Sequence, residues 1–353
     1  MSNLYRALKR LWLLATLALA AGLAPAPAVR AQFAPALVAE VQQINQAGPP
    51  RSTPAVHSGP AGKAAPDPSL IKAEVLLARA HASPGEADGR PGANLTRAIK
   101  AFEQMHALPV DGRLTEPVWA ALTAGQQHPI AAIYTVTPAD VAGPFYPAVS
   151  YKFVAAAKLP ALGYARPSQM LAERFHMSER LLAALNPGAD FRKPGAQLVV
   201  MQPWTPPLPA VDHVEVDKAN AQLRAYDATG SLVASFPTTV GSRERPSPSG
   251  VRKVRWVTYN PFYTYDPRKL SWGPKGHGVL TIKPGPENPV GVVWIALNAP
   301  GYGIHGAPNP DLIGKTQSHG CVRLTNWDAL LLAHAVRPGV VVAFVHQRGG
   351  SAA

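Results

Sequence analysis

The sequence of 353 residues has a single cysteine, Cys321. One cysteine makes no disulfide within the chain and no cysteine-rich zinc or iron–sulfur site, so the fold does not depend on such cross-links. Charged residues are scarce, at 16%, and no nucleic-acid-binding motif occurs, which argues against a nucleic-acid partner. The uncharged run at 11–24 has 14 residues, fewer than the roughly 20 that a membrane-spanning helix needs.

Apolar residues are plentiful, at 47%, which is enough to bury real hydrophobic cores. The length is that of two or three domains. Proline (38 residues) and glycine (29 residues) are abundant, and this combination predicts compact modules joined by stiff connectors. The net charge of +13 favours an anionic partner.

The first 31 residues have the layout of a secretory signal peptide, with a charged start, a short apolar middle and a small-residue end at Ala31. The basic residues of this segment are Arg6, Lys9, Arg10 and Arg30. Cleavage after Ala31 takes these four charges from +13 and leaves +9. We therefore expect an exported protein of the periplasm or cell envelope with no stable membrane span after cleavage. A retained membrane anchor is the alternative.

Residues 32–65 show little periodicity and are predicted to be a linker. Residues 66–130 show helical spacing, with Ser69 placed to cap a first helix and Thr115 placed to start the last. A second helix between them is marked by Leu95, Ile99 and Phe102. The segment resembles a three-helix peptidoglycan-binding module. The residues that carry this resemblance are Asn94, Ala98, Phe102, Glu103, 108–112, Thr115 and Leu122. A helical spacer without a ligand is the alternative.

Residues 134–208 are predicted to form a second small unit that ends in a proline-rich linker. The pattern indicates helices at 168–175 and 178–185 and a strand at 197–201. The stretches 171–178 and 181–187 resemble a lysin-motif (LysM) glycan-binding repeat, although the strand that usually opens this repeat is not evident in the sequence. A glycan-binding role and a purely structural role are both open for this unit.

Residues 209–347 are predicted to form a mostly β domain with one main helix, so the fold class is multidomain α+β. Strands are expected at 213–216, 221–226, 231–236, 251–259, 292–297 and 340–346. The turn at 227–230, which ends in glycine, predicts a hairpin between the second and third of these strands. Asn326 is expected to cap the helix, with Asp328 in its first turn.

The chemistry is concentrated in His305-Gly306 and in the stretch 318–324, which contains Cys321. A thiol near its ordinary pKa of about 8.5 is only a few per cent ionised at pH 7, so it needs a neighbouring base or cation to act as a nucleophile. His305 or His319 could supply the base. Glycine at position 320 would let backbone N–H groups approach a carbonyl oxygen that gains negative charge.

These residues resemble the signature of the L,D-transpeptidase catalytic domain, together with Asn326 and Asp328. The resemblance implies β-sheets packed around one helix, a peptidoglycan stem-peptide substrate and a cysteine acyl-enzyme. It implies that Cys321 is the nucleophile, that His305 is the base and that the backbone carbonyl of Gly306 completes the triad. Beside these we assign His319 an orienting or oxyanion role and Gly320 an oxyanion role. The residues expected to contact the substrate are Ser318, Arg323 and Tyr302.

The expected reaction cleaves the diaminopimelate–D-Ala bond of a tetrapeptide stem and passes the acyl group to an amine, either of another stem or of an outer-membrane lipoprotein. No cofactor or metal is expected. A carboxypeptidase that uses water as the acceptor involves the same residues. The competing hypotheses are a non-catalytic wall-binding protein, a zinc site at His305, His319 and Cys321, and a buried inert thiol.

Overall fold

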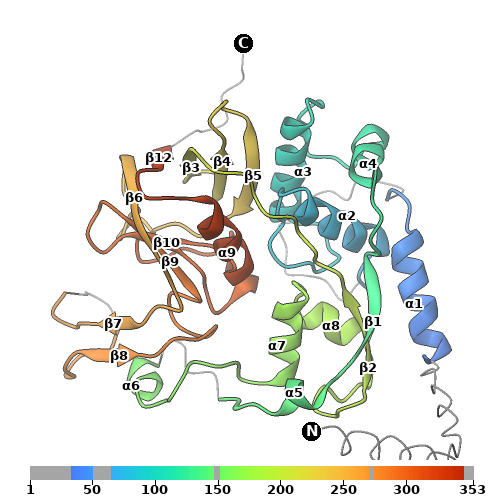
Figure 1. Cartoon of the computed structure of the whole chain (residues 1–353), viewed down its shortest axis with the longest axis horizontal. Coiled ribbons are helices and arrows are strands. Elements are labelled where there is room, and N and C mark those ends of the chain that lie inside the picture. Colours follow the sequence, from blue (N-terminus) through green and yellow to red (C-terminus); the bar gives the residue numbers. More distant parts are fainter. Residues whose placement is uncertain (1–32, 51–64, 147–151, 270–272, 346–353) are drawn as a thin grey trace, which may run out of the picture. The chain divides into compact units, whose positions relative to one another are not determined.

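The computed structural model describes residues 33–50, 65–146, 152–269 and 273–345 (Figure 1). The expected signal peptide at 1–31 lies outside the described residues. Within the described part of the chain, no helix is both long enough and apolar enough to cross a membrane. The multidomain α+β class is confirmed, with a helical N-terminal module and a mostly β C-terminal domain.

The helical module begins one helix earlier than the sequence indicates. Its helices are α1 (Pro35–Gln46), α2 (Pro68–Arg79), α3 (Ala93–Met105) and α4 (Glu116–Thr123). We predicted a linker over 32–65, but residues 35–46 are helical because Leu37, Val41 and Ile44 form one apolar stripe, and Ile44 is fully buried. The predicted cap of α2 is also corrected, since Asp67 is the N-cap and its carboxylate accepts a hydrogen bond from the Ser69 N–H at 2.8 Å.

The second unit contains β1 (Ala131–Thr135), α5 (Pro138–Val141), α6 (Phe153–Ala156), α7 (Pro167–Arg174), α8 (Glu179–Leu185) and β2 (Gln197–Met201). β1 is an opening strand that sequence analysis missed, and it pairs antiparallel with β2 along its whole length. Its sequence is short and alanine-rich, so the pairing with a distant strand determines its conformation more than local preference does. Both small units share one hydrophobic core, which includes Phe102 and Leu198.

The C-terminal domain is built on an eight-stranded sheet in the described residues, with the order β11-β10-β9-β6-β12-β3-β4-β5 (Figure 1). The strands are β3 (His213–Asp217), β4 (Gln222–Tyr226), β5 (Leu232–Pro237), β6 (Gly250–Tyr259), β9 (Val293–Leu297), β10 (Gly303–His305), β11 (Val322–Arg323) and β12 (Val341–Val345). Six of them lie where they were expected, including the β4–β5 hairpin. β10 and β11, which carry the site residues, were not predicted.

Helix α9 (Asn326–Ala335) packs on β9 and β10 of this sheet (Figure 1). Ala329 and Leu332 of the helix share a buried core with Ile295 and Ile304 of the strands. Thr325, and not Asn326, is the N-cap, and its hydroxyl accepts a hydrogen bond from the Asp328 N–H. Asn326 is therefore the first helical residue, and its side chain is free to face inward.

A hairpin of β7 (Tyr263–Tyr265) and β8 (Leu280–Ile282) stands beside the sheet. Phe153 of α6 and Leu162 pack against Tyr265 and Ile282 in a third hydrophobic cluster. The short helix η1 (Pro310–Leu312) lies in the loop between β10 and β11. A segment of the second unit therefore supports the hairpin beside the eight-stranded sheet.

Candidate active site

One cleft brings together four of the predicted site residues. Cys321, His305, His319 and Arg323 all line a cavity of about 430 Å³ at the β10–β11 end of the sheet. The rest of its lining is mostly apolar and aromatic, and consists of Phe153, Thr258, Pro261, Phe262, Tyr263, Thr264, Pro289, Val290, Trp294 and Gly301. A concave, largely apolar pocket with a few convergent polar groups is the usual form of a small-molecule or peptide site.

The turn that carries Cys321 is shaped by Ser318. The buried Ser318 hydroxyl donates to the Cys321 carbonyl at 2.6 Å and accepts from the Gly320 N–H at 3.1 Å. Gly320 has φ +119°, a conformation that L side chains rarely adopt, and a Cβ there would lie 2.9 Å from the ring of Tyr302. Ser318, which we expected to contact substrate, therefore shapes the turn, and the Gly320 N–H that we expected to be an oxyanion donor is already bonded.

The thiol of Cys321 is half-buried and is kept in its neutral form. Its Sγ donates a weak hydrogen bond to the carbonyl oxygen of Gly301 at 3.7 Å. Burial raises the pKa of the thiol, and this effect outweighs the backbone N–H of Gly303 and the charge of Arg323, which both lower it. Attack on a carbonyl therefore requires a base that removes the thiol proton.

His305 is held by the chain immediately after it. Its Nδ1 lies 2.6 Å from the Gly306 carbonyl oxygen, and its ring stacks on Trp294 with the centroids 5.3 Å apart. A carbonyl only accepts, so Nδ1 carries the proton and Nε2 of the neutral ring has the free lone pair. Burial, assisted by the charge of Arg323, lowers the pKa of His305 to about 3, against a smaller opposing effect of the Gly306 carbonyl. The ring is therefore a neutral base at physiological pH.

Arg323 and His319 differ in how far they are buried. The backbone of Arg323 pairs with Thr239 on one side and, within β11, with His305 on the other. Its Nε is buried and has no hydrogen-bond partner among the described residues, and its side chain lines the cavity. His319 is exposed, and partial burial and the charges of Arg323 and Arg245 lower its pKa.

The last predicted residue, Tyr302, and the aromatic residues after β6 lie at different places around the cleft. The ring of Tyr302 lies beside Gly320 and is not among the described residues that line the cavity. The aromatic stretch after β6 divides in two, because Phe262 and Tyr263 line the cavity whereas Tyr265 is fully buried. Trp272 of the same stretch lies outside the described residues.

Sequence reasoning missed three contributors to this site. Gly301 offers its carbonyl to the thiol, Trp294 stacks on His305, and Phe153 reaches the cleft from the second unit. Trp294 was part of a predicted strand, but its partner across the strands was not predictable. Phe153 carries no local signal at all, because it is placed by packing against β7 and β8.

The described residues form no separate cluster of metal ligands. In the part of the chain that the structure describes, no three His, Cys, Asp or Glu side chains gather as a metal site. The cleft offers a thiol, a neutral imidazole and a guanidinium. A thiol and a neutral imidazole are groups that acyl transfer through a covalent intermediate can use.

Comparison with known proteins agrees with this class. The family model of the L,D-transpeptidase catalytic domain matches residues 211–343, and that of a "Putative peptidoglycan binding domain" matches residues 67–122. The chain is 30% identical over 142 residues to the "Putative L,D-transpeptidase YqjB" of Bacillus subtilis, a match that covers 38% of this chain and 72% of that protein. The chain belongs to the L,D-transpeptidase family.

Two other relatives match over a longer stretch. The "Putative L,D-transpeptidase YkuD" of Bacillus licheniformis is 28% identical over 177 residues, covering 50% of this chain and 91% of that protein. The "Probable L,D-transpeptidase ErfK/SrfK" of Escherichia coli is 29% identical over 187 residues, covering 52% of this chain and 60% of that protein. In each case the match leaves about half of this chain uncovered.

Proposed function

We propose that this protein is a peptidoglycan L,D-transpeptidase that acts through a thioester on Cys321. The observation that carries the proposal is the shared cleft of Cys321 and His305, in a chain of this family. The substrate would be a tetrapeptide stem, and the bond broken would be the one between diaminopimelate and the terminal D-Ala. The cell envelope is the expected location, because the substrate is there.

In the first step, Nε2 of His305 takes the thiol proton while Sγ of Cys321 attacks the diaminopimelate carbonyl. The tetrahedral intermediate collapses when the same proton passes to the nitrogen of D-Ala, which leaves as the free amino acid. The product is a thioester between the stem and Cys321. The neutral ring supports this sequence, because a base that is already protonated at pH 7 could not accept the thiol proton.

The negative charge of the intermediate needs hydrogen-bond donors. The Gly320 N–H donates to Ser318, so we assign the main oxyanion role to the Cys321 N–H, with His319 at the open side of the cleft as a second donor. Arg323 is the candidate for the substrate carboxylate, because its positively charged side chain lines the cavity.

The acyl acceptor decides the biological outcome. An amine of a second stem gives a cross-link, a lysine of an outer-membrane lipoprotein gives a wall anchor, and water gives carboxypeptidase activity. The apolar lining of the cleft favours an amine over water, because an apolar wall lowers the local concentration of water at the thioester.

The N-terminal units would hold the enzyme on its polymeric substrate. The matched peptidoglycan-binding segment supports this for residues 67–122. The LysM-like unit at 134–208 is proposed to bind glycan on its sequence pattern and on the β1–α7–α8–β2 order of its elements, although a structural role fits the same order.

The test is to incubate the mature protein with purified disaccharide-tetrapeptide and to follow the masses of enzyme and products. We expect an adduct on Cys321 that corresponds to loss of D-Ala and that disappears when an amine is added. An enzyme that stays unmodified while muropeptides still bind would indicate a wall-binding protein without activity. Iodoacetamide sensitivity without chelator sensitivity would separate the thiol mechanism from a zinc mechanism.

A further inference from the structure

The first turn of α9 is contacted by residues of both N-terminal units. Asn326, Trp327 and Asp328 are consecutive, and Thr325 alone separates them from the stretch 318–324 that contains Cys321. Each meets one residue from the N-terminal half of the chain, and the three contacts are Asn326 with Glu173, Trp327 with His176, and Asp328 with Ser83. The His176 and Trp327 rings stack with centroids 4.6 Å apart, and Ser83 Oγ donates to Asp328 Oδ2 at 2.9 Å.

Asn326 connects this turn to the catalytic histidine. Its side chain is buried, and its Oδ1 accepts a hydrogen bond from the Val292 N–H at 3.2 Å. The same oxygen lies so close to Gly306 that a Cβ built there would be 2.2 Å from it. The carbonyl of Gly306 is the group that holds Nδ1 of His305. The orientation of the Asn326 amide therefore limits where this carbonyl can lie.

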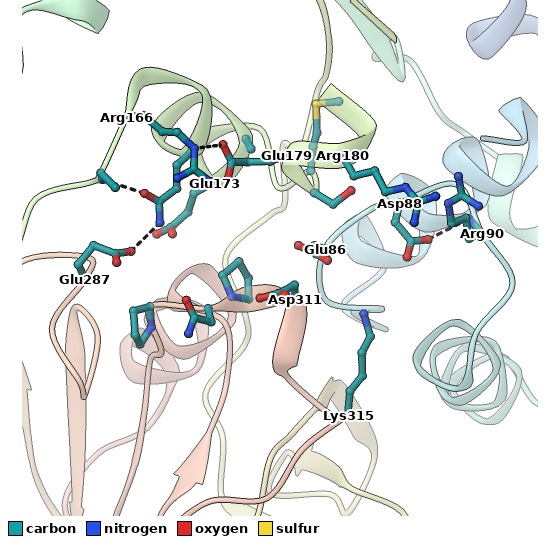
Figure 2. A pocket seen from close by; sticks show the side chains of 18 of the residues that line it. Glu86, Asp88, Arg90, Arg166, Glu173, Glu179, Arg180, Glu287, Asp311 and Lys315 are labelled. Carbon is teal, nitrogen blue, oxygen red and sulfur yellow. Dashed lines mark hydrogen bonds and ion pairs between the residues drawn. The ribbon is translucent and has the colours of Figure 1, made fainter. Parts of the chain in front are cut away.

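The orientation of the amide is fixed from its nitrogen side. Nδ2 of Asn326 donates to Oε1 of Glu173 at 2.9 Å and to the carbonyl of Pro286 at 3.2 Å. Glu173 lies on α7 of the second unit, at the wall of another cavity of about 710 Å³, where Figure 2 shows it near Glu287. Of the partners named here for the Asn326 amide, Glu173 alone bonds through its side chain. It lies outside the catalytic domain.

We propose that Glu173 is a positioning residue for His305, so that the second unit completes the active site through Asn326 and Gly306. This proposal takes the role of His305 from the proposed function. Loss of the Glu173 carboxylate leaves Nδ2 of Asn326 with a single acceptor. The amide then has freedom to rotate, the Gly306 carbonyl loses its fixed position, and the His305 ring loses its preference for the tautomer with a free Nε2.

The conservative variant separates hydrogen bonding from charge. In Glu173→Gln, the amide oxygen still accepts from Asn326, whereas in Glu173→Ala only the Pro286 carbonyl remains as an acceptor. We expect kcat to fall about tenfold in Glu173→Ala with KM changed less than about twofold, and to stay near the wild-type value in Glu173→Gln. An equal loss of kcat in both variants would overturn the hydrogen-bond account.

The second measurement does not depend on any substrate. Long-range ¹⁵N NMR distinguishes the two tautomers of a neutral histidine, and the signal of His305 is identified by its absence from His305→Gln. The wild-type protein and Glu173→Gln should show a protonated Nδ1 and an unprotonated Nε2. Glu173→Ala should show both nitrogens moved toward their average. An unchanged His305 signal in folded Glu173→Ala would refute the proposal, even if the wild-type protein transferred no stem peptide.

The matched control is Glu179→Ala. Glu179 lies on α8 of the same unit and lines the same cavity, and within the described part of the chain its side chain bonds to Arg166 and Ser168 and not to α9 (Figure 2). A general loosening of the unit would affect both alanine variants. We expect the His305 signal to stay at its wild-type position in Glu179→Ala, and a shift equal to that of Glu173→Ala would count against a specific path through Asn326.

Discussion

The contact between Gly306 and Asn326 lies between two regions of the molecule, the cleft with Cys321 and His305 and the first turn of α9 with its partners. The polar groups of these two regions differ in what they do. On the cleft side, Cys321 and His305 are kept neutral in mostly apolar surroundings. On the α9 side, Asp328 and Glu173 are acids whose pKa burial raises to about 7, and both accept hydrogen bonds across a boundary between units. The cleft side keeps reactive and hydrogen-bonding groups available for a substrate. The polar groups of the α9 side instead bond to other parts of the protein and hold the structure together.

The largest effect should come from the cleft side. Cys321→Ala removes the only thiol, so formation of the acyl-enzyme should fall on the order of 10⁴-fold, while binding to isolated cell walls should stay within about twofold. Enzyme mass after incubation with tetrapeptide and a wall pull-down measure the two properties. Unchanged muropeptide products in the variant would end the thioester mechanism. Cys321→Ser is the matched control for the space that the side chain fills.

The next effect comes from the contact between the two sides. A Cβ at position 306 would lie 2.2 Å from Oδ1 of Asn326, whose amide is bonded at both ends. Gly306→Ala should therefore displace the carbonyl that holds His305 and lower kcat about 10²-fold. The control is Gly278→Ala, because nothing lies within 4 Å of a Cβ there. Wild-type kcat in a folded Gly306→Ala protein would show that the carbonyl does not orient the ring.

These two sides were not equally predictable from the sequence. Cys321, His305 and Gly306 could be identified because their chemistry is contained in a short motif. The β4–β5 hairpin and helices α7 and α8 could be predicted because their patterns are local. By contrast, strands of two or three residues such as β10 and β11 have no periodicity to read.

The contacts of α9 with the N-terminal units could not be predicted for a different reason. Glu173 and Asn326 are 153 residues apart, and Ser83 and Asp328 are 245 apart. Neither partner stands out in its own segment, since an acid in an amphipathic helix is normally a solvated side chain. Helix α1 was not predicted for another reason. Its apolar residues have helical spacing, but the surrounding stretch is rich in alanine and proline and obscures the pattern.

A smaller effect should appear in the stability of the α9 side. The Asp328 carboxyl has a pKa of about 7 in the folded protein, chiefly because it is buried, and a usual value near 3.9 when unfolded. The folded state therefore holds the proton more tightly, and the stability gained below about pH 4 is lost as the pH rises to 7. Asp328→Asn does not ionise and still offers an oxygen to Ser83. Relative to the wild-type protein, it should gain about 4 kcal/mol in unfolding free energy between pH 4 and pH 8.

Urea unfolding at both pH values measures this gain. Glu116→Gln is the control, because Glu116 is exposed and its side chain accepts no hydrogen bond from the described residues. The control should differ from the wild-type protein by the same amount at pH 4 and pH 8. If Asp328→Asn behaved in the same way as this control, the Asp328 carboxyl would not be protonated in the folded protein.

The smallest change is expected in the pH dependence of the cleft. With a pKa of about 3, His305 is neutral from pH 5 to pH 8, and the raised pKa of Cys321 keeps the thiol protonated over most of that range. The rate of acylation by tetrapeptide should therefore vary less than about twofold between pH 5 and pH 7. The pH–rate profile should show no rise or fall near the usual histidine pKa of 6.5. Iodoacetamide reacts with the thiolate, so its rate should instead keep rising above pH 8. Rapid alkylation at pH 5 would show that Cys321 and His305 form a thiolate–imidazolium pair. The groups of the cleft would then be ionised, and the contrast between a neutral cleft and the ionisable acids of the α9 side would be lost.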